Sequence, residues 1–400
     1  TITDALFRAG AVVLSRSAKY RRPRGAYCLR GDCGSCMVRV DGRPNVRACT
    51  TPMHDGVRVE RQNLHGPLKA DPTALVDRLF PGGFDHHHFM VKPRVANEVM
   101  QAVARQLTGL GRVPDDDVRV HGQPLDLHPT VLVIGGGPAG LAVHATLTDA
   151  DVDVLTVERG PRVDAPAGLH DRTAIFAAYP AESLFAAQRS GGRRTERDGA
   201  VFEEHLVRIH PTHVVFTMGT RAPLLPIANN DLPGVVAAAG IRETLTRTGG
   251  SLAPECVLIG DSPHARAHAE ILGVDTVLTS DDVQRLERRG ETLRVHTRDV
   301  HHDAPLVLLD PAPAPAHELA VMSGATVEFV ERESPACAGF RVTRDARGWV
   351  GPMRGVREIQ MWAAGGVCGV TEPEEAAEDG RAVARALLTA LQDGAPEEEG

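Results

Sequence analysis

The sequence predicts an α/β protein in which a small cysteine-rich domain precedes two dinucleotide-binding folds. Three observations support this prediction. Four cysteines lie within 22 positions near the N-terminus, a glycine-rich turn follows a buried strand at residue 135, and a similar unit recurs near residues 255–279. Strands that alternate with helices in this way are typical of parallel sheets covered by helices.

The composition is that of an ordinary globular chain. Its 400 residues are 42% hydrophobic and 24% charged, which excludes a disordered or collagen-like protein. A net charge of −8 gives no electrostatic support for binding to nucleic acid or to an anionic membrane. Residues 1–65 differ, because they carry 12 Lys or Arg against 5 Asp or Glu, whereas the remainder carries 32 against 47. This first part is therefore a separate module.

The sequence contains no targeting or membrane signal that we can identify. No stretch approaches the roughly 20 apolar residues of a membrane span, and the N-terminus lacks the apolar core of a signal peptide. We therefore expect a cytoplasmic protein without a membrane span. In a reducing compartment, a cluster of four among seven cysteines indicates a metal site before it indicates disulfides.

The cysteine spacing is the most specific signal in the chain. It reads Cys28-x4-Cys33-x2-Cys36-x12-Cys49, and its first intervals match those of plant-type [2Fe–2S] ferredoxins. The predicted metal ligands are therefore Cys28, Cys33, Cys36 and Cys49. Zinc is the alternative, although zinc sites favour two separated cysteine pairs. A [2Fe–2S] cluster here would make the module a one-electron carrier.

A hairpin explains how the fourth cysteine returns to the other three. Residues 38–40 and 46–48 alternate like strands, and Asp41-Gly42 between them predicts a two-residue turn. Regular pairing from Val40 opposite Arg43 would place Cys49 opposite Gly34. Gly31 and Gly34 are expected to adopt positive φ and to leave N–H groups directed at sulfur.

Residues 66–127 predict a connector that contains one helix. Apolar residues recur at helical spacing between Ala96 and Leu107. Within the connector, His86-His87-His88 raises a metal hypothesis. On an extended segment only His86 and His88 would share a face, so packing at an interface or beside a cofactor is the favoured interpretation.

The glycine turn predicts a dinucleotide site. A buried strand at 130–134 leads directly into Gly135-Gly-Gly137-Pro-Ala-Gly140 and a helix. Gly135 would allow the turn, Gly137 the approach of a pyrophosphate, and Gly140 close packing of helix and strand. Glu158 ends the next strand, where it can accept from a ribose hydroxyl. The predicted cofactor residues of this region are Gly135, Gly137, Pro138, Ala139, Gly140, Glu158 and Arg159, and a purely structural glycine turn is the alternative.

Two later segments favour FAD over NAD as the bound dinucleotide. Residues 214–220 and 361–367 resemble the later motifs of two-dinucleotide-domain flavoproteins, where the chain returns to the FAD domain. They add Gly219, Gly365 and Gly366 to the predicted site. These flavoproteins usually have an Asp, which binds the ribityl chain, where this sequence has Gly366. We expect weaker flavin binding unless another group substitutes.

The second nucleotide unit is expected to be a remnant. Its strand and turn begin at Cys256 and Gly260, but Ser262 and Ala265 stand where glycines are needed. A Cβ atom at 262 would obstruct a phosphate, so we expect no NAD(P) binding. The predicted domains are 1–65 for the iron–sulfur module, 66–127 for the connector, 128–225 with 345–400 for FAD, and 226–344 for the remnant.

Several segments together resemble one protein family. They are Arg16–Gly25 before the cysteines, Asn45–Cys49, Gly109–Arg112, the Gly135 turn and Asn229–Val235. With these residues the sequence resembles the α-subunit side of the heterotetrameric sarcosine oxidase family, which includes hydrogen cyanide synthase, opine oxidases and dye-linked proline dehydrogenases.

This resemblance implies a β-grasp [2Fe–2S] domain joined to a glutathione-reductase-like Rossmann flavoprotein fold that binds FAD. It also implies a partner flavoprotein β subunit that oxidises the C–N bond of an amino or imino acid, an FMN between the subunits in several members, and a further small subunit as a candidate partner. This chain would then relay electrons. We expect no folate-binding C-terminal half in this chain, and we expect the hairpin before the first β-grasp helix to be absent or to lie outside the sequence.

Two other functions remain open from the sequence. One is a self-contained NAD(P)H-dependent flavin and iron–sulfur reductase, against which the altered turn at Gly260 argues. The other is a non-catalytic scaffold that only assembles a partner. The scattered cysteines, Cys256, Cys337 and Cys368, are interpreted as small buried hydrophobic residues, with Cys368 close enough in sequence to the last flavin motif to contact the cofactor.

Overall fold

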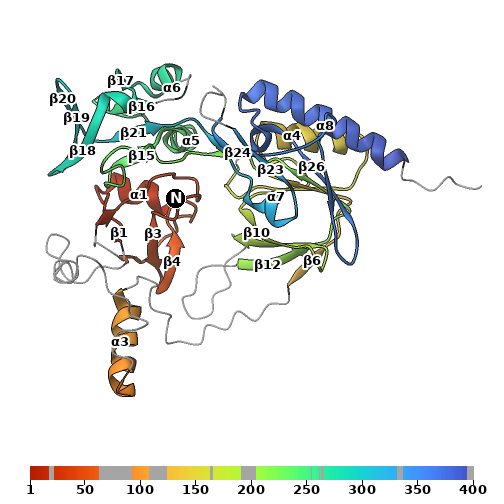
Figure 1. The fold of residues 1–400 in the computed structure, drawn as a ribbon, viewed down its shortest axis with the longest axis horizontal. Helices are drawn as coiled ribbons and strands as arrows, with labels where there is room; N and C mark the ends of the chain where they lie inside the picture. The colour runs from red at the N-terminus through yellow and green to blue at the C-terminus, as the bar shows by residue number, and fades with distance from the viewer. Residues whose placement is uncertain are drawn as a thin grey trace, which may run out of the picture. The chain divides into compact units, whose positions relative to one another are not determined.

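The computed structural model describes residues 1–17, 22–62, 92–107, 124–162, 165–190, 204–253, 255–260, 262, 265–330 and 337–393. The histidine run at 86–88 and the segment 109–112 lie outside these residues. The chain divides into two compact units (Figure 1). The first unit is Thr1–Arg119 with Leu224–Pro311, and the second unit is Val120–Pro223 with Ala312–Gly400. Within the described ranges, no helix is both long and apolar enough to span a bilayer.

The iron–sulfur module and the second nucleotide fold belong to the same unit. The chain enters the other unit at Ala312, earlier than the expected return at residue 345. The reason is that strand β22 (Ala314–Pro315) pairs with β14 (Thr220–Arg221), which fixes residues 312 onward beside the first nucleotide fold.

The cysteine-rich module is a small sheet with one helix. The helix is α1 (Ile2–Arg8), and the sheet has the order β4-β3-β5 with antiparallel pairing. Its strands are β3 (Met37–Val40), β4 (Arg43–Arg47) and β5 (Val59–Arg61), and a separate pair is formed by β1 (Ser15–Arg16) and β2 (Pro23–Arg24). Ile2, Leu14, Val38 and Val40 are buried between these elements.

The hairpin turn is confirmed, but its expected register is wrong beyond the first pair. Asp41 and Gly42 both have positive φ, and Val40 lies opposite Arg43. A bulge then intervenes, so Val38 pairs with Val46. Asn45 adopts a φ of 60° there, and its N–H donates to Gln62 Oε1 at 2.6 Å. This bond satisfies the amide that the bulge leaves unpaired.

The second nucleotide fold has a four-stranded parallel sheet of order β15-β21-β16-β17. Its strands are β15 (Val235–Ala237), β21 (Val307–Asp310), β16 (Val257–Gly260) and β17 (Thr276–Leu278), with helices α5 (Ala238–Thr248) and α6 (Ala265–Leu272). An antiparallel sheet follows the 3-10 turn η1 (Ser280–Asp282) and consists of β18 (Val283–Arg289), β19 (Thr292–Thr297) and β20 (His301–Ala304). The expected strand–helix–strand near 255–279 is thus confirmed, as is the connector helix, α3 (Arg94–Leu107).

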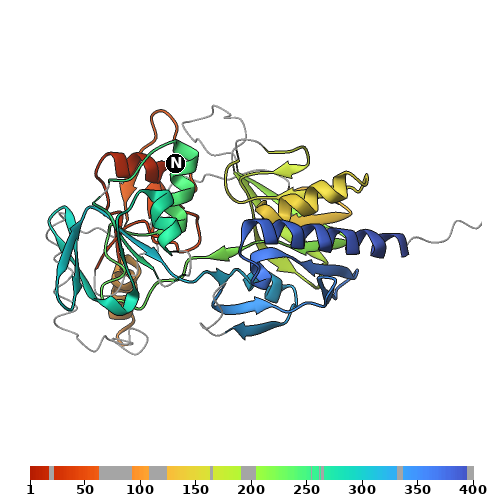
Figure 2. The same ribbon diagram turned by 90° about the horizontal axis from the view of Figure 1, so that it is seen from above.

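The other unit contains the first nucleotide fold, built on a six-stranded sheet of order β25-β26-β13-β7-β8-β9. The strands are β25 (Trp349–Met353), β26 (Ile359–Ala363), β13 (His213–Phe216), β7 (Val131–Ile134), β8 (Val154–Val157) and β9 (Leu169–His170). All neighbours pair in parallel except β25 and β26. Helices α4 (Pro138–Thr148) and α8 (Pro373–Asp393) lie side by side on one face (Figure 2).

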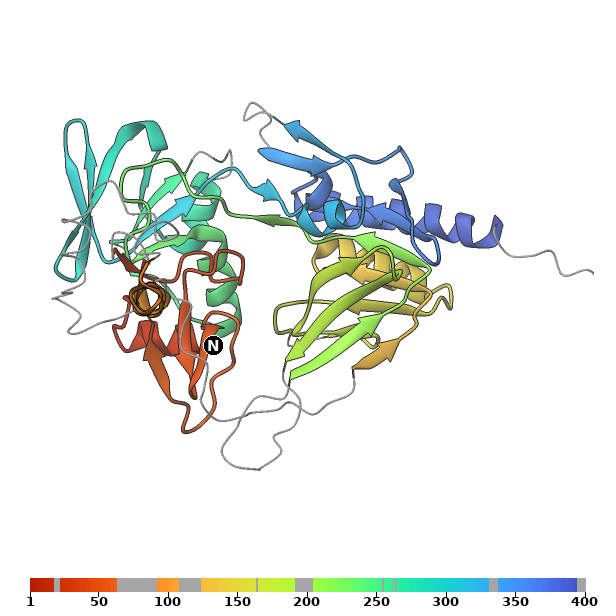
Figure 3. The same cartoon turned by 60° about the horizontal axis from the view of Figure 1, so that its bottom comes forward.

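Alternation along the central strands separates two hydrophobic cores. Val131, Val133 and Val215 pack with the residues of α4 and α8. Leu132 and Phe216 face the opposite way. They pack against a second, four-stranded sheet of order β10-β11-β12-β6, which covers that face (Figure 3). Its strands are β10 (Thr173–Tyr179), β11 (Leu184–Ser190), β12 (Glu204–Ile209) and β6 (Leu125–Leu127).

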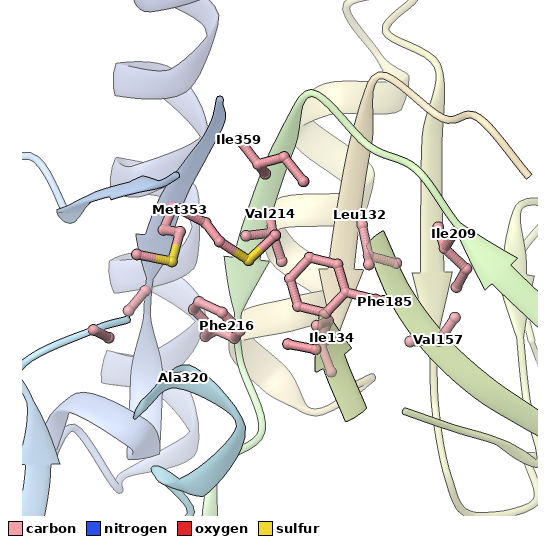
Figure 4. Packing of buried hydrophobic residues seen from close by; sticks show 14 of the residues in the cluster. Leu132, Ile134, Val157, Phe185, Ile209, Val214, Phe216, Ala320, Met353 and Ile359 are labelled. Atoms are coloured by element: carbon pink, nitrogen blue, oxygen red, sulfur yellow. The ribbon is translucent and has the colours of Figure 1, made fainter. Parts of the chain in front are cut away.

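Phe185 and Phe216 join these two sheets. Both side chains are fully buried, and their rings meet edge to face with centroids 6.4 Å apart (Figure 4). The remaining elements of the unit are α7 (Glu318–Met322), the antiparallel pair β23 (Val327–Val330) and β24 (Gly339–Val342), and the 3-10 turn η2 (Gly365–Cys368).

Candidate functional site

The sulfur atoms of the four predicted ligands gather in one loop. Cys36 Sγ lies 3.3 Å from Cys49 Sγ, and the thiols of Cys33 and Cys49 both hydrogen-bond to Cys28. Cys28, Cys36 and Cys49 are buried, Cys33 is exposed, and all four are free thiols. The hairpin therefore returns Cys49 to the other three despite the bulge, because Ala48 N–H donates to the carbonyl of Cys36.

Backbone amides of the loop point at these sulfurs. Cys28 Sγ accepts from the N–H groups of Arg30, Asp32 and Cys33 at 3.5, 3.2 and 3.4 Å, and Cys33 Sγ accepts from that of Ser35 at 3.4 Å. The loop can curve this tightly because Gly31 and Gly34 have positive φ, as expected. The hydrogen bonds that Cys33 and Cys49 make to Cys28 lower the pKa of the Cys28 thiol and raise the pKa of the Cys33 and Cys49 thiols, as expected for sulfurs held close together. Four convergent thiols with amides directed at them fit an iron–sulfur cluster.

The glycines of the first nucleotide turn have different structural roles. A Cβ atom on Gly135 would lie 2.3 Å from Thr217 O, and one on Gly140 would lie 1.8 Å from Gly135 O. These two positions therefore require glycine for packing alone. A Cβ on Gly137 would meet no atom within 4 Å. The space in front of the N-terminus of α4 is open at Gly137, as a cradle for a pyrophosphate requires.

Glu158 and an unforeseen arginine border this cradle. The Glu158 carboxylate accepts from Gly136 N–H at 2.7 Å and from Gly160 N–H at 2.8 Å. Its remaining lone pairs can accept from ribose hydroxyls. Arg162 donates from Nη1 to the carbonyl of Gly136. The predicted Arg159 is exposed. Arg162, which no sequence motif indicated, contacts the glycine turn.

The two later motifs meet at their glycines. A Cβ on Gly366 would lie 3.0 Å from both Gly219 Cα and Thr220 Cγ2, so a side chain at this position fits only if these neighbours shift by a few tenths of an ångström. The segment around Gly366 is instead bonded to a carboxylate from another element: Asp379 of α8 accepts a hydrogen bond from Gly365 N–H at 2.8 Å. Asp379 also accepts from Arg344 at 2.8 Å. Sequence reasoning missed Asp379, since it lies on the C-terminal helix outside any motif.

The scattered cysteines are buried, as expected. Burial raises the pKa of the Cys256 and Cys337 thiols and raises that of Cys368 to about 12. These three thiols are therefore protonated, unreactive residues at neutral pH.

At the described residues of the second nucleotide turn, polar side chains meet at Asp310. Asp310, at the carboxyl end of β21, is buried and accepts from the Ser262 hydroxyl at 2.9 Å. His268 Nδ1 lies 2.9 Å from the same carboxylate oxygen. A nucleotide fold binds phosphate at this edge of its sheet, and this one presents a carboxylate instead.

Comparisons with known proteins agree with this description. The family described as "2Fe-2S iron-sulfur cluster binding domain" matches residues 1–64. Sarcosine oxidase subunit alpha of Rhizobium meliloti is 27% identical over 320 residues, which are 70% of this chain and 32% of that protein. Hydrogen cyanide synthase subunit HcnA of Pseudomonas aeruginosa is 38% identical over 63 residues, 16% of this chain and 60% of that protein. The chain thus spans about a third of the length of the sarcosine oxidase subunit.

A solved structure shares the fold over almost the whole chain. L-proline dehydrogenase from P. horikoshii superposes with a TM-score of 0.65 at 14% identity, covering 98% of this chain and 70% of that one. The predicted fold class, an iron–sulfur module followed by two nucleotide folds, is therefore confirmed. The chain is thus similar in sequence to the sarcosine oxidase α subunit over 70% of its length and, in its N-terminal part, to hydrogen cyanide synthase subunit HcnA.

Proposed function

We propose that this chain is the electron-transferring FAD and [2Fe–2S] subunit of a multi-subunit amino- or imino-acid dehydrogenase or oxidase. One observation carries the proposal: the same chain contains a four-thiol loop with convergent amides and a glycine turn whose middle residue leaves open space. Each of the two features fits a redox cofactor, and their combination is what an electron relay requires.

In this proposal FAD binds to the second unit, which contains the first nucleotide fold. Gly137 and the N-terminus of α4 would hold the pyrophosphate, because the backbone there has free donors and no side chain in the way. Glu158 would accept from the adenosine ribose, and its negative charge disfavours a 2′-phosphate. Gly219, Gly365 and Gly366 would form the wall of the site near the flavin, with Asp379 holding Gly365 in place.

The first unit would hold the cluster on Cys28, Cys33, Cys36 and Cys49. When bound, FAD accepts an electron pair and can release electrons singly, and a [2Fe–2S] cluster carries one. The chain's own contribution is to keep the ligand sulfurs close together and to supply N–H donors to them. Such donors stabilise the added negative charge of a reduced cluster.

Substrate oxidation is assigned to a partner flavoprotein β subunit. Support comes from the relatives, which are named as subunits, and from the sarcosine and proline in the names of relatives and of the structural neighbour. An FMN at the interface with that partner and a further small subunit are part of the same proposal. The substrate class is therefore an amino or imino acid with an oxidisable C–N bond.

The test is anaerobic co-purification of the tagged chain with its partners. We expect a visible spectrum with flavin and iron–sulfur bands, FAD on extraction, and iron with acid-labile sulfide. Adding sarcosine or proline to the complex should bleach the flavin and produce the paramagnetic signal of a reduced cluster. Colourless protein with stoichiometric zinc, or reduction by NADH instead of by any amino acid, would contradict the proposal.

A further inference from the structure

The second nucleotide fold contacts the cluster loop through its first strand and helix. Ala237, the last residue of β15, donates its N–H to the carbonyl of Tyr27 at 2.9 Å. Tyr27 directly precedes the ligand Cys28 and is itself buried. The backbone of the cluster loop is thus bonded to the carboxyl end of the parallel sheet, the edge at which such a sheet ordinarily receives a nucleotide.

Gly240 brings α5 against the ligand itself. A Cβ atom on Gly240 would lie 2.1 Å from the carbonyl oxygen of Cys28 and 3.0 Å from Leu29 Cβ. Glycine inside a helix costs about 1 kcal/mol relative to alanine, and Gly240 lies in the first turn of an 11-residue helix. The close approach to Cys28 is the structural reason for a glycine at this position.

Polar contacts between the iron–sulfur module and the second nucleotide fold lie near the contact between Gly240 and Cys28. Arg22 donates to Asp231 Oδ1 at 2.6 Å and to Asn229 Oδ1 at 3.0 Å. Arg30, two residues after Cys28, pairs with Glu243 of α5 at 3.1 Å.

Two further contacts extend the interface on either side. A Cβ on Gly25 would lie 3.1 Å from Pro233 Cα, and Arg247 of α5 pairs with Asp4 of α1 at 3.3 Å. Ion pairs, a backbone hydrogen bond and two glycine contacts therefore hold the two parts together.

Among the described residues of its own nucleotide turn, this fold has a side chain where a glycine would be needed. Ser262 stands at the position of the second glycine of a nucleotide turn, and its hydroxyl is bonded to the buried Asp310 carboxylate. A dinucleotide pyrophosphate would have to approach this negative charge. The strand and helix of this fold instead contact the cluster loop, through Ala237 of β15 and Gly240 of α5.

We propose that the second nucleotide fold serves as the docking platform of the iron–sulfur module, and that Gly240 is a positioning residue for the cluster ligand Cys28. This inference rests on the cluster part of the proposed function. The platform holds the backbone of the cluster loop at Tyr27 and Cys28. The orientation of the Cys28 sulfur and of the amides that point at it therefore depends on α5.

The experiment compares Gly240→Ala with Arg242→Ala in the full chain. Arg242 is exposed two residues further along the same helix, so its variant controls for substitution in α5. We expect Gly240→Ala to change the g values of the reduced cluster and its reduction potential, and to hasten loss of iron to a chelator. Arg242→Ala should match the wild type. Unchanged g values and potential in folded Gly240→Ala would overturn the inference.

If Gly240→Ala does not fold, a second variant tests the docking role of the second nucleotide fold. Asp231→Asn removes the charge that binds Arg22 without adding volume, and it should speed iron loss by about threefold, the scale of a partly exposed ion pair. An unchanged rate would overturn the docking role. Wild-type protein that contains no iron would instead refute the proposed function, so the two failures are distinguishable.

Discussion

Gly366 packs directly on Gly219, since a Cβ atom added to Gly366 would lie 3.0 Å from the Gly219 Cα atom. The two residues come from the two motifs that return the chain to the first nucleotide fold, one after β13 and the other after β26. The contact brings together the two segments that resemble the later motifs of two-dinucleotide-domain flavoproteins. A side chain at position 366 would therefore press on Gly219 and Thr220 and would require them to shift.

We therefore expect Gly366→Asp to destabilise the second unit instead of improving flavin binding. The added side chain would overlap Gly219 and Thr220, and overpacking of this kind costs about 1–3 kcal/mol. Both tryptophans of the chain, Trp349 and Trp362, lie in this unit. Urea unfolding followed by tryptophan fluorescence will therefore report on it selectively. A variant that unfolds like the wild type and binds FAD more tightly would refute this explanation.

Local signals in the sequence were sufficient for much of the fold. The Asp41-Gly42 turn, the Gly135 turn and the helix after it depend on residues close together in the chain, and all three are present. The hairpin bulge was missed because its amide partner, Gln62, lies 17 residues from Asn45.

Contacts between residues far apart in the chain could likewise not be predicted from local sequence. Gly240 touches Cys28, and Asp379 bonds Gly365, through packing that no motif encodes. The resemblance did identify the segments around Arg22 and Asp231 as characteristic. The structure now shows that these two segments bind each other across 209 positions of sequence.

Replacement of one ligand should remove the cluster without disturbing the second unit. In Cys28→Ser we expect iron to fall from about two atoms per chain to a small fraction, because the sulfur that receives three amide donors is lost. Cys256→Ala, which removes a buried thiol outside the loop, is the matched control and should retain iron. Tryptophan-monitored unfolding should be the same in both variants. Full iron content together with an unchanged visible spectrum in Cys28→Ser would exclude Cys28 as a ligand.

Two glycine variants separate binding from packing in the first nucleotide turn. Gly137→Ala adds a methyl group to open space at ordinary backbone angles, so the fold should be unaffected. FAD affinity should nevertheless fall by about tenfold or more, the equivalent of roughly 1.4 kcal/mol, because the methyl group occupies the pyrophosphate position. Gly140→Ala should destabilise the unit itself, since its Cβ would lie 1.8 Å from Gly135 O.

Flavin content after gel filtration and fluorescence-monitored unfolding measure the two effects independently. Equal FAD affinity in Gly137→Ala and the wild type would mean that the open space is not a cofactor cradle.

The contact between Ser262 and Asp310 predicts that the chain does not use nicotinamide dinucleotides. At about 1 mM NADH or NADPH, a concentration that would reveal even millimolar affinity, stopped-flow absorbance should show no rapid flavin reduction. The Asp310 carboxylate and the Ser262 hydroxyl occupy the edge where a pyrophosphate would lie. Reduction within milliseconds would instead favour a self-contained reductase.

The stability of the second unit should depend on pH through His213. This residue begins β13, in the middle of the six-stranded sheet, and burial lowers its pKa from the usual 6.5. The unfolded chain therefore binds the proton more readily than the folded chain. The resulting contribution to stability is complete above pH 6.5 and is lost as the pH falls through the lower folded pKa. Burial, with a smaller contribution from Arg189, lowers the pKa of His170 in the same direction.

Tryptophan-monitored urea unfolding should accordingly give a smaller free energy of unfolding at pH 5.5 than at pH 7.5, and His213→Gln should reduce that difference. His205→Gln, at an exposed position of β12 in the same unit, is the control and should leave the difference unchanged. If His213→Gln keeps the full pH dependence, the proton responsible binds elsewhere in the unit.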